Sequence, residues 1–365
     1  MTGAKKIFSK IIAILIMLAL GFAIGLGIGI ALNHMVGRFA FIELLIMLLV
    51  AYFLNVVLHE AGHLVMGLAT GYRFLSFRVL SWTLIRGENG RYRVNSFNIP
   101  GTLGQCLLVP PELDDNGHMP VVLYNLGGII VNFIIAAVSA YIVFFTPIAG
   151  HGRIFLTLFG IIGLMQGIEN AIPLESVGIN NDGTNLKRLA SSPRVVQSLW
   201  KQLMINAYQT YGYLFQQMPD ELFAMPSMDE MKDNLVSVEA LFVENREMEI
   251  MNHENTLDTL DFILDSRKIN LMNIYRITAE SDRILVKLLL GKPVTVERSF
   301  RKSLSQLSVF PNVIVAQYAI ARLVDKNEKE AEKLRKKFDK VIGKYPFRSD
   351  KLTLPRYMNE VDKKA

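Results

Sequence analysis

Two histidines and a glutamate form a motif whose residue types and spacing fit hydrolytic metal chemistry. The motif reads His59-Glu60-Ala61-Gly62-His63. Residues i and i+4 lie on the same face of a helix, so both imidazoles could reach one metal ion. Glu60, beside the first histidine, is placed to take a proton from a metal-bound water. The motif therefore predicts a zinc site at His59 and His63, with Glu60 as the general base.

A catalytic zinc ion needs a third protein ligand and keeps one position open for water. A carboxylate-rich stretch between residues 169 and 183 could supply that ligand. Pro173 is expected to end a helix there, and Gly183 would let the chain turn back towards the histidines. The candidate ligands in this stretch are Glu169, Glu175 and Asp182. The residues alone leave all three open.

Four apolar stretches are long enough to cross a bilayer as helices of about 20 residues. They cover residues 11–32, 39–58, 121–145 and 154–174. The motif lies at the end of the second stretch, and the acidic stretch follows the fourth. Basic residues are concentrated before the first stretch and between the second and third, which indicates that these segments face the cytoplasm. We therefore expect a multi-pass protein of a bacterial plasma membrane, with both termini in the cytoplasm.

The composition supports this classification and excludes several others. Of the 365 residues, 51% are hydrophobic and 20% are charged, and the apolar excess is concentrated in residues 11–175. A wholly soluble enzyme is therefore excluded. The single cysteine, Cys106, excludes an internal disulfide framework. The net charge of +6 is scattered rather than arranged as a basic surface, so no nucleic-acid partner is expected.

An HExxH motif at the end of a membrane helix, followed by Asn-x-x-Pro and Asp-Gly elements at the end of a later one, resembles the site-2 protease family of intramembrane zinc metalloproteases. The later elements lie at residues 170–173 and 182–183. A Gly-x-x-x-Asn element of the family matches residues 128–132, although Ile129 replaces the usual proline. The resemblance covers residues 39–190.

The resemblance implies roles for three further residues. Asp182 would be the third zinc ligand. Asn132 and Asn170 would hold the unwound backbone of the substrate. The substrate class implied is a membrane-spanning peptide or protein, cut inside the lipid bilayer.

The loop at residues 72–118 has the composition of a β-hairpin. Residues 78–86 and 91–97 are predicted strands, and residues 87–90 supply the turn. An exposed hairpin edge could pair with an extended substrate strand. The resemblance implies a membrane-re-entrant hairpin here, and a hairpin that only caps the helices is the alternative. Residues 101–111 are expected to dip back against the membrane, with Cys106 as a small buried residue.

Residues 185–365 have helical periodicity and few strand signals. The segments 282–300 and 316–334 look alike at an offset of 34 residues, the period of tetratricopeptide repeats. This favours an array of helical hairpins, with a plain helical bundle as the alternative. The expected role of this cytoplasmic domain is docking of a protein partner or regulation.

The predicted fold class is a membrane all-α protein with four transmembrane helices, a hairpin loop and a helical C-terminal domain. Residues 1–38 form the first helix, 39–184 the metalloprotease core and 185–365 the C-terminal domain. The predicted function is that of an intramembrane zinc endopeptidase acting at the cytoplasmic side. Two alternatives remain: a non-proteolytic membrane scaffold or receptor, and a different HExxH protease whose third ligand is Glu169 or Glu175.

Overall fold

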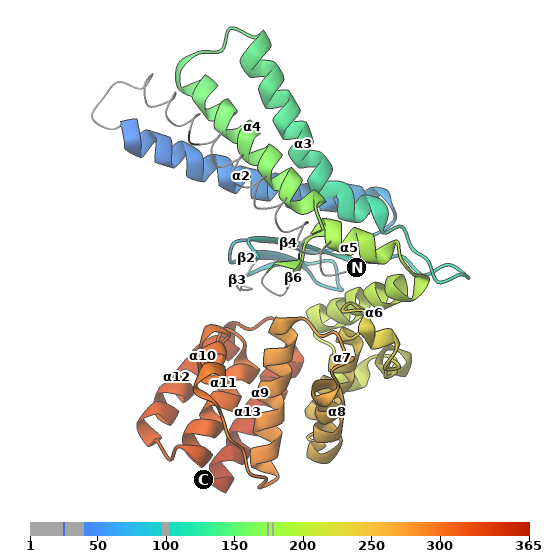
Figure 1. The fold of residues 1–365 in the computed structure, drawn as a ribbon, viewed down its shortest axis with the longest axis vertical. Coiled ribbons are helices and arrows are strands. Elements are labelled where there is room, and N and C mark those ends of the chain that lie inside the picture. Colours follow the sequence, from blue (N-terminus) through green and yellow to red (C-terminus); the bar gives the residue numbers. More distant parts are fainter. Residues whose placement is uncertain (1–24, 26–39, 97–101, 174, 177–178) are drawn as a thin grey trace. The chain divides into compact units, whose positions relative to one another are not determined.

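The computed structural model describes residues 25, 40–96, 102–173, 175–176 and 179–365 (Figure 1). It is mostly helical and contains a small antiparallel sheet. The described residues divide into two compact units. Of these residues, the first unit comprises 25, 40–66, 123–173 and 181–184, and the second comprises 67–96, 102–122, 175–176, 179–180 and 185–365.

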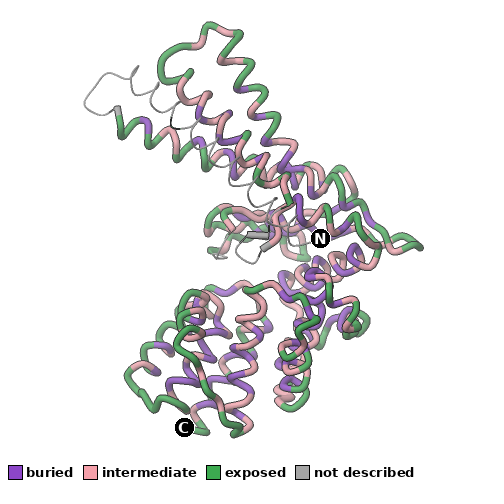
Figure 2. The backbone as a smooth tube through the Cα atoms, in the orientation of Figure 1, coloured by how far each residue is buried: buried purple, intermediate pink, exposed green. Residues whose placement is uncertain are grey.

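Three long apolar helices make up most of the first unit. They are α2 (Ala40–Ala69), α3 (Val122–Phe145) and α4 (Gly150–Ala171). Each is long and apolar enough to cross a membrane, and Figure 2 shows extended exposed stretches along them. Helices satisfy their own backbone hydrogen bonds, so helices with exposed apolar side chains are suited to contact with lipid. Three of the four predicted spans are thus confirmed as helices, and the predicted span at 11–32 lies outside the described residues.

Glycines allow these helices to approach closely. A Cβ atom on Gly62 of α2 would lie 2.3 Å from the carbonyl oxygen of Gly127 on α3, and a Cβ on Gly127 would lie 2.3 Å from the oxygen of Gly62. A Cβ on Gly160 of α4 would lie 2.8 Å from Cβ of Ser139 on α3. Small residues at such crossings let backbones pack directly, which is the usual means of helix association in membranes.

A four-stranded antiparallel sheet begins the second unit. Its strands are β1 (Arg73–Val79), β2 (Trp82–Arg86), β3 (Tyr92–Ser96) and β4 (Gly104–Val109), in the spatial order β3-β2-β1-β4. The predicted β2–β3 hairpin is confirmed, and its turn is closed by a hydrogen bond from Gly87 N to Arg91 O. The prediction of one strand over 78–86 was wrong. Leu80, with φ of 54°, forms a turn that splits this segment between β1 and β2.

Residues 104–109 form a sheet strand, where a segment dipping back against the membrane was predicted. This strand, β4, pairs with β1, and Val109 packs with Leu75 of β1 and Ala207 of α6 (Pro193–Tyr211). Residues 106–109 form a short continuous apolar run, and such a run is equally compatible with a buried strand. Cys106 is buried, as predicted.

The remainder of the second unit is helical. Two two-residue strands, β5 (Glu175–Ser176) and β6 (Ile179–Asn180), pair with each other ahead of α5 (Asp182–Leu189), which spans the boundary between the units. After α6 and three short 3-10 turns come α7 (Val238–Glu249), α8 (His253–Asp265), α9 (Asn273–Leu289), α10 (Arg298–Gln306), α11 (Pro311–Ala319), the π-helical turn η4 (Ile320–Val324), α12 (Glu328–Lys344) and α13 (Arg348–Lys364).

The predicted tetratricopeptide-like architecture is not confirmed. Both similar segments contain helices joined by a connection: residues 290–297 join α9 to α10, and residues 325–327 join η4 to α12. The second helices of the two pairs differ greatly in length, with nine residues in α10 and 17 in α12. Helix α11 instead packs at the centre of a shared core with α9, α12 and α13.

Candidate metal centre

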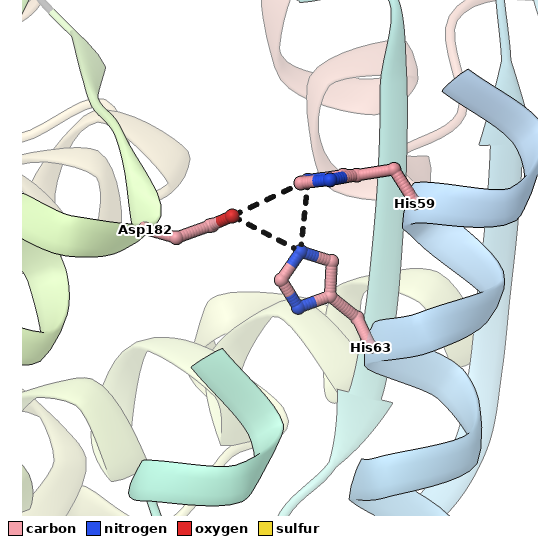
Figure 3. Close-up of side chains that lie close together, drawn as sticks. All are labelled: His59, His63 and Asp182. Atoms are coloured by element: carbon pink, nitrogen blue, oxygen red, sulfur yellow. Dashed lines mark hydrogen bonds and ion pairs between the residues drawn. The ribbon is translucent and has the colours of Figure 1, made fainter. Parts of the chain in front are cut away.

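Three ligand atoms from distant parts of the chain meet within the first unit (Figure 3). The Nε2 atoms of His59 and His63 lie 3.2 Å apart, and they lie 3.2 and 3.3 Å, respectively, from Oδ2 of Asp182. Ligands held 2.0–2.1 Å from a tetrahedral zinc ion lie about 3.3 Å from one another. The spacing of the three atoms therefore fits such an ion, with the fourth position left open.

The hydrogen bonds of the two rings determine which nitrogen faces the centre. His59 Nδ1 donates to Oδ1 of Asn132 at 2.5 Å, and His63 Nδ1 donates to the carbonyl oxygen of Tyr124 at 2.7 Å. Both partners are acceptors, so each neutral ring carries its proton on Nδ1 and a lone pair on Nε2. Metal-binding histidines characteristically donate their second nitrogen in this way.

The end of α4 and the start of α5 position Asp182. Helix α4 ends at Ala171, two residues before Pro173, as predicted. The side chain of Asn181 donates to the carbonyl oxygens of Glu169 and Ile172, both at 2.7 Å, and accepts from Thr184 N at 3.0 Å. It thereby satisfies the last carbonyls of one helix and the first amides of the next.

Gly183 makes this connection sterically possible. A Cβ atom at Gly183 would lie 2.4 Å from the carbonyl oxygen of Ala171. Any larger residue would push the first turn of α5 away from α4, and Asp182 with it. In the Asp-Gly pair, Asp182 is thus the candidate ligand, and Gly183 allows α5 to pack closely enough against α4 for Asp182 to reach the histidines.

The centre is largely withdrawn from solvent. The side chains of His59, His63 and Asp182 are 12%, 10% and 19% exposed. Burial raises the pKa of the Asp182 carboxyl, and the hydrogen bonds and positive charge that the two imidazoles supply when protonated lower it, with a net pKa well below the usual range. The carboxylate is therefore ionised at neutral pH, as a metal ligand must be.

The space beside His59 depends on Gly128. A Cβ atom on this residue would lie 2.4 Å from Cε1 of the His59 ring. One helical turn later, Asn132 accepts the Nδ1 proton of the same ring and is fully buried. The Gly-x-x-x-Asn element thus gives the ring both its space and its hydrogen-bond acceptor.

These arrangements can be compared with known proteins. The family model described as Peptidase family M50 matches residues 47–344. The chain belongs to this family, the site-2 proteases. No curated protein and no solved structure matches the chain. Membership of family M50 implies intramembrane metalloprotease activity and agrees with the three membrane-length helices.

The other predicted site residues of this M50 peptidase differ in their exposure and contacts. Glu60 follows His59 on α2 and is partly exposed. Asn170, near the end of α4, donates its side-chain amide to Gln166 O at 3.0 Å. Glu169 is exposed and is not part of the group of three converging ligands. The side chain of Glu175 lies outside what the structure describes, so its candidacy stays open.

Sequence reasoning missed two groups that hold the site. Tyr124 acts through its backbone carbonyl, which no residue pattern reveals. Asn181 precedes the Asp-Gly pair, and an asparagine before a helix start is a recognisable capping signal. Asn55, one turn before His59, donates to Ala51 O and to Phe159 O of α4, so it serves helix packing.

Replacing Asn132 by Ala should weaken zinc binding by roughly 10- to 100-fold, the usual cost of losing a hydrogen-bond partner of a metal ligand. Competition with a chromogenic chelator on the purified M50 peptidase would measure the affinity. Asn170→Ala is the matched control, because its described hydrogen bond reaches Gln166 rather than a ligand. Equal zinc affinity in both variants would contradict the positioning role of Asn132.

Proposed function

We propose that this M50 peptidase is a zinc endopeptidase that hydrolyses peptide bonds in or near transmembrane segments of other membrane proteins. The proposal places the reaction at the cytoplasmic side of a bacterial plasma membrane. That orientation follows from the basic residues of the 72–118 loop and from the positive-inside rule. The motif-bearing end of α2, the start of α3 and the end of α4 then all belong to one side of the membrane.

One observation carries the proposal. The Nε2 atoms of two imidazoles and one carboxylate oxygen lie within 3.3 Å of one another. Acceptors so close repel one another unless a cation lies between them. Two nitrogens and one oxygen in a tetrahedral arrangement with one open position are a donor set typical of catalytic zinc.

The residues of the site are proposed to have different roles in hydrolysis. His59, His63 and Asp182 would hold the zinc ion, which when bound lowers the pKa of water and polarises a carbonyl group. Glu60 receives the proton of the attacking water and delivers it to the departing amide nitrogen. Asn132 holds the His59 ring in place. Asn170 is proposed to bind the unwound substrate backbone.

The substrate class is proposed from the position of the HExxH motif on a helix long and apolar enough to cross a membrane. A peptide bond in a membrane helix is already hydrogen-bonded, so the helix must unwind before a nucleophile can reach its carbonyl carbon. Single membrane-spanning segments unwind at the least cost, because few neighbouring helices hold them. An edge of the sheet, at β3 or β4, is proposed to receive the unwound strand.

Mass spectrometry of membrane peptides from cells would test the function and identify the substrate. Cells carrying Glu60→Gln should accumulate uncut membrane segments that are absent from wild-type cells, and lose the corresponding fragments. Glu169→Gln is the control, because this exposed carboxylate is not part of the converging group. Identical peptide patterns in wild-type and Glu60→Gln cells would favour a non-proteolytic scaffold.

A further inference from the structure

A cavity of about 450 Å³ lies within the second unit. Its walls come from one face of the sheet and from helices α6, α7, α9 and α13. The volume falls within the range of small-ligand sites in proteins, about 300–1,000 Å³. Side-chain amides make up much of the polar lining, including those of Gln202, Asn206, Gln209, Asn245 and Asn312. Amides at such density suit a ligand with peptide-like hydrogen-bonding groups.

Three acidic residues line the same cavity from three helices. They are Glu244 of α7, Asp282 of α9 and Asp350 of α13. Glu244 is 1% exposed, and its Oε1 atom is buried without a hydrogen-bond partner. Asp282 accepts hydrogen bonds from Asn312 Nδ2 at 3.0 and 3.2 Å. A buried carboxylate oxygen without a donor is costly, so the position of Glu244 calls for a partner.

Among the described residues, no basic side chain forms an ion pair with these three acids. Arg78, a basic residue of the lining, is instead bound to the sheet. Its guanidinium donates to Leu80 O at 2.9 Å, to Gly104 O at 3.3 Å and to the side chain of Thr102. None of the three acids is therefore paired with a basic side chain in the part of the chain that the structure describes.

The spacing of the three acids indicates whether the cavity fits a metal ion or an organic cation. Ligand atoms of one Mg²⁺ or Zn²⁺ lie at most about 4.2 Å apart, twice the bond length. In the described part of the chain, three acidic or histidine ligands come within 4.8 Å of one another at His59, His63 and Asp182. The cavity acids are spaced more widely. A guanidinium or alkylammonium group, with several N–H donors, can reach carboxylates at that spacing.

We propose that this cavity binds an organic cation, a guanidinium or alkylammonium group, between Glu244, Asp282 and Asp350. The lining amides would bind the polar groups attached to that cation. A peptide with an arginine or lysine side chain and a free polyamine share this chemistry. The site is separate from the metal centre and gives the C-terminal helices a ligand of their own.

The ionisation of the acids supports this assignment. Burial, followed by repulsion from Glu249, raises the pKa of Asp350 to about 7. Burial and repulsion from Asp350 also raise the pKa of Asp282 to about 7, although the hydrogen bonds from Asn312 lower it. The pKa of Glu244 is raised by the same causes. A cation binds the ionised forms, so its affinity should increase from pH 6 to pH 8. The titratable or charged residues that line the cavity are Arg78, Glu244, Tyr275, Asp282, Tyr345 and Asp350, and Glu249 adds to the repulsion on Asp350.

Calorimetric titration of the full chain in detergent would test the site. The probes are acetyl-Ala-Arg-Ala-amide and the same peptide with citrulline, a neutral isostere of arginine, in its place. We expect at least tenfold tighter binding of the arginine peptide at pH 8 and a smaller preference at pH 6. Glu244→Gln and Asp282→Asn should each reduce this preference at least tenfold. Glu254→Gln, an exposed acid on α8, is the matched control and should leave it unchanged.

Two further arms identify the source of the cation and exclude a metal. Spermidine that displaces the arginine peptide at lower concentration would support the cation site and assign it to a free polyamine. Displacement by Ca²⁺ or Mg²⁺ would overturn the proposal in favour of a metal site. Equal binding of the arginine and citrulline peptides would also overturn it. Thermal unfolding of each variant shows whether it folds. Glu244→Gln should not lower the unfolding temperature, because the Oε1 atom that it replaces has no hydrogen-bond partner.

Discussion

Replacing Glu60 by Gln should reduce the rate of peptide hydrolysis by at least about 100-fold while zinc remains bound. Glutamine has the shape of glutamate but cannot accept a proton at neutral pH, and general bases typically contribute 10²- to 10⁴-fold to the rate. The three converging ligand atoms are untouched by the change. Purified protein in detergent, given a membrane-spanning substrate, would provide the rate, and elemental analysis would give zinc per chain.

Two comparisons make this result specific. Glu169→Gln changes an exposed carboxylate at the end of α4 and should retain wild-type activity. A Glu60→Gln protein that cleaves at the wild-type rate would contradict the general-base role. A variant that loses zinc as well as activity would instead show that Glu60 supports the metal.

Replacing Asp182 by Ala should lower zinc affinity by more than about 100-fold and abolish hydrolysis. The change removes one of three ligands, so its effect should exceed the 10- to 100-fold loss typical of a residue that only orients a ligand. Removal of zinc by a chelator should lower the unfolding temperature of the wild type, because bound metal stabilises the folded state. The variant should show no such response.

The third-ligand assignment can be separated from its alternatives with matched variants. Glu169→Ala and Glu175→Ala each remove one acid from the same connection between α4 and α5. Both should keep one zinc per chain if Asp182 is the ligand. An Asp182→Ala protein that retains zinc, together with a Glu169 or Glu175 variant that loses it, would transfer the role to that glutamate.

The apolar helices were predictable from the sequence because membrane spans need little more than length and hydrophobicity. The sheet was harder to predict. A turn at Leu80 requires a left-handed backbone conformation that no glycine or asparagine marks. Strand β4 is short, and its pairing with β1 depends on contacts between segments far apart in the sequence.

The metal centre was predictable to a similar, limited extent. The spacing of His59 and His63 follows from helix geometry alone. The position of Asp182 depends on a side chain that joins two helix ends and on a glycine with no space for a Cβ atom. Residue types can suggest such a connection, but the direction in which the chain returns is set by packing.

The contact between Gly62 and Gly127 has a consequence for mutational scans of this protein. Two backbones meet there without side chains, so no change of rotamer can absorb an added methyl group. A saturation library should show near-complete intolerance at both positions, as strong as at the metal ligands, although neither glycine has a functional group to offer. Ranking positions by their intolerance of substitution would therefore place these two packing glycines among the metal ligands and catalytic residues. Measurements of bound zinc would be needed to distinguish packing positions from ligand positions.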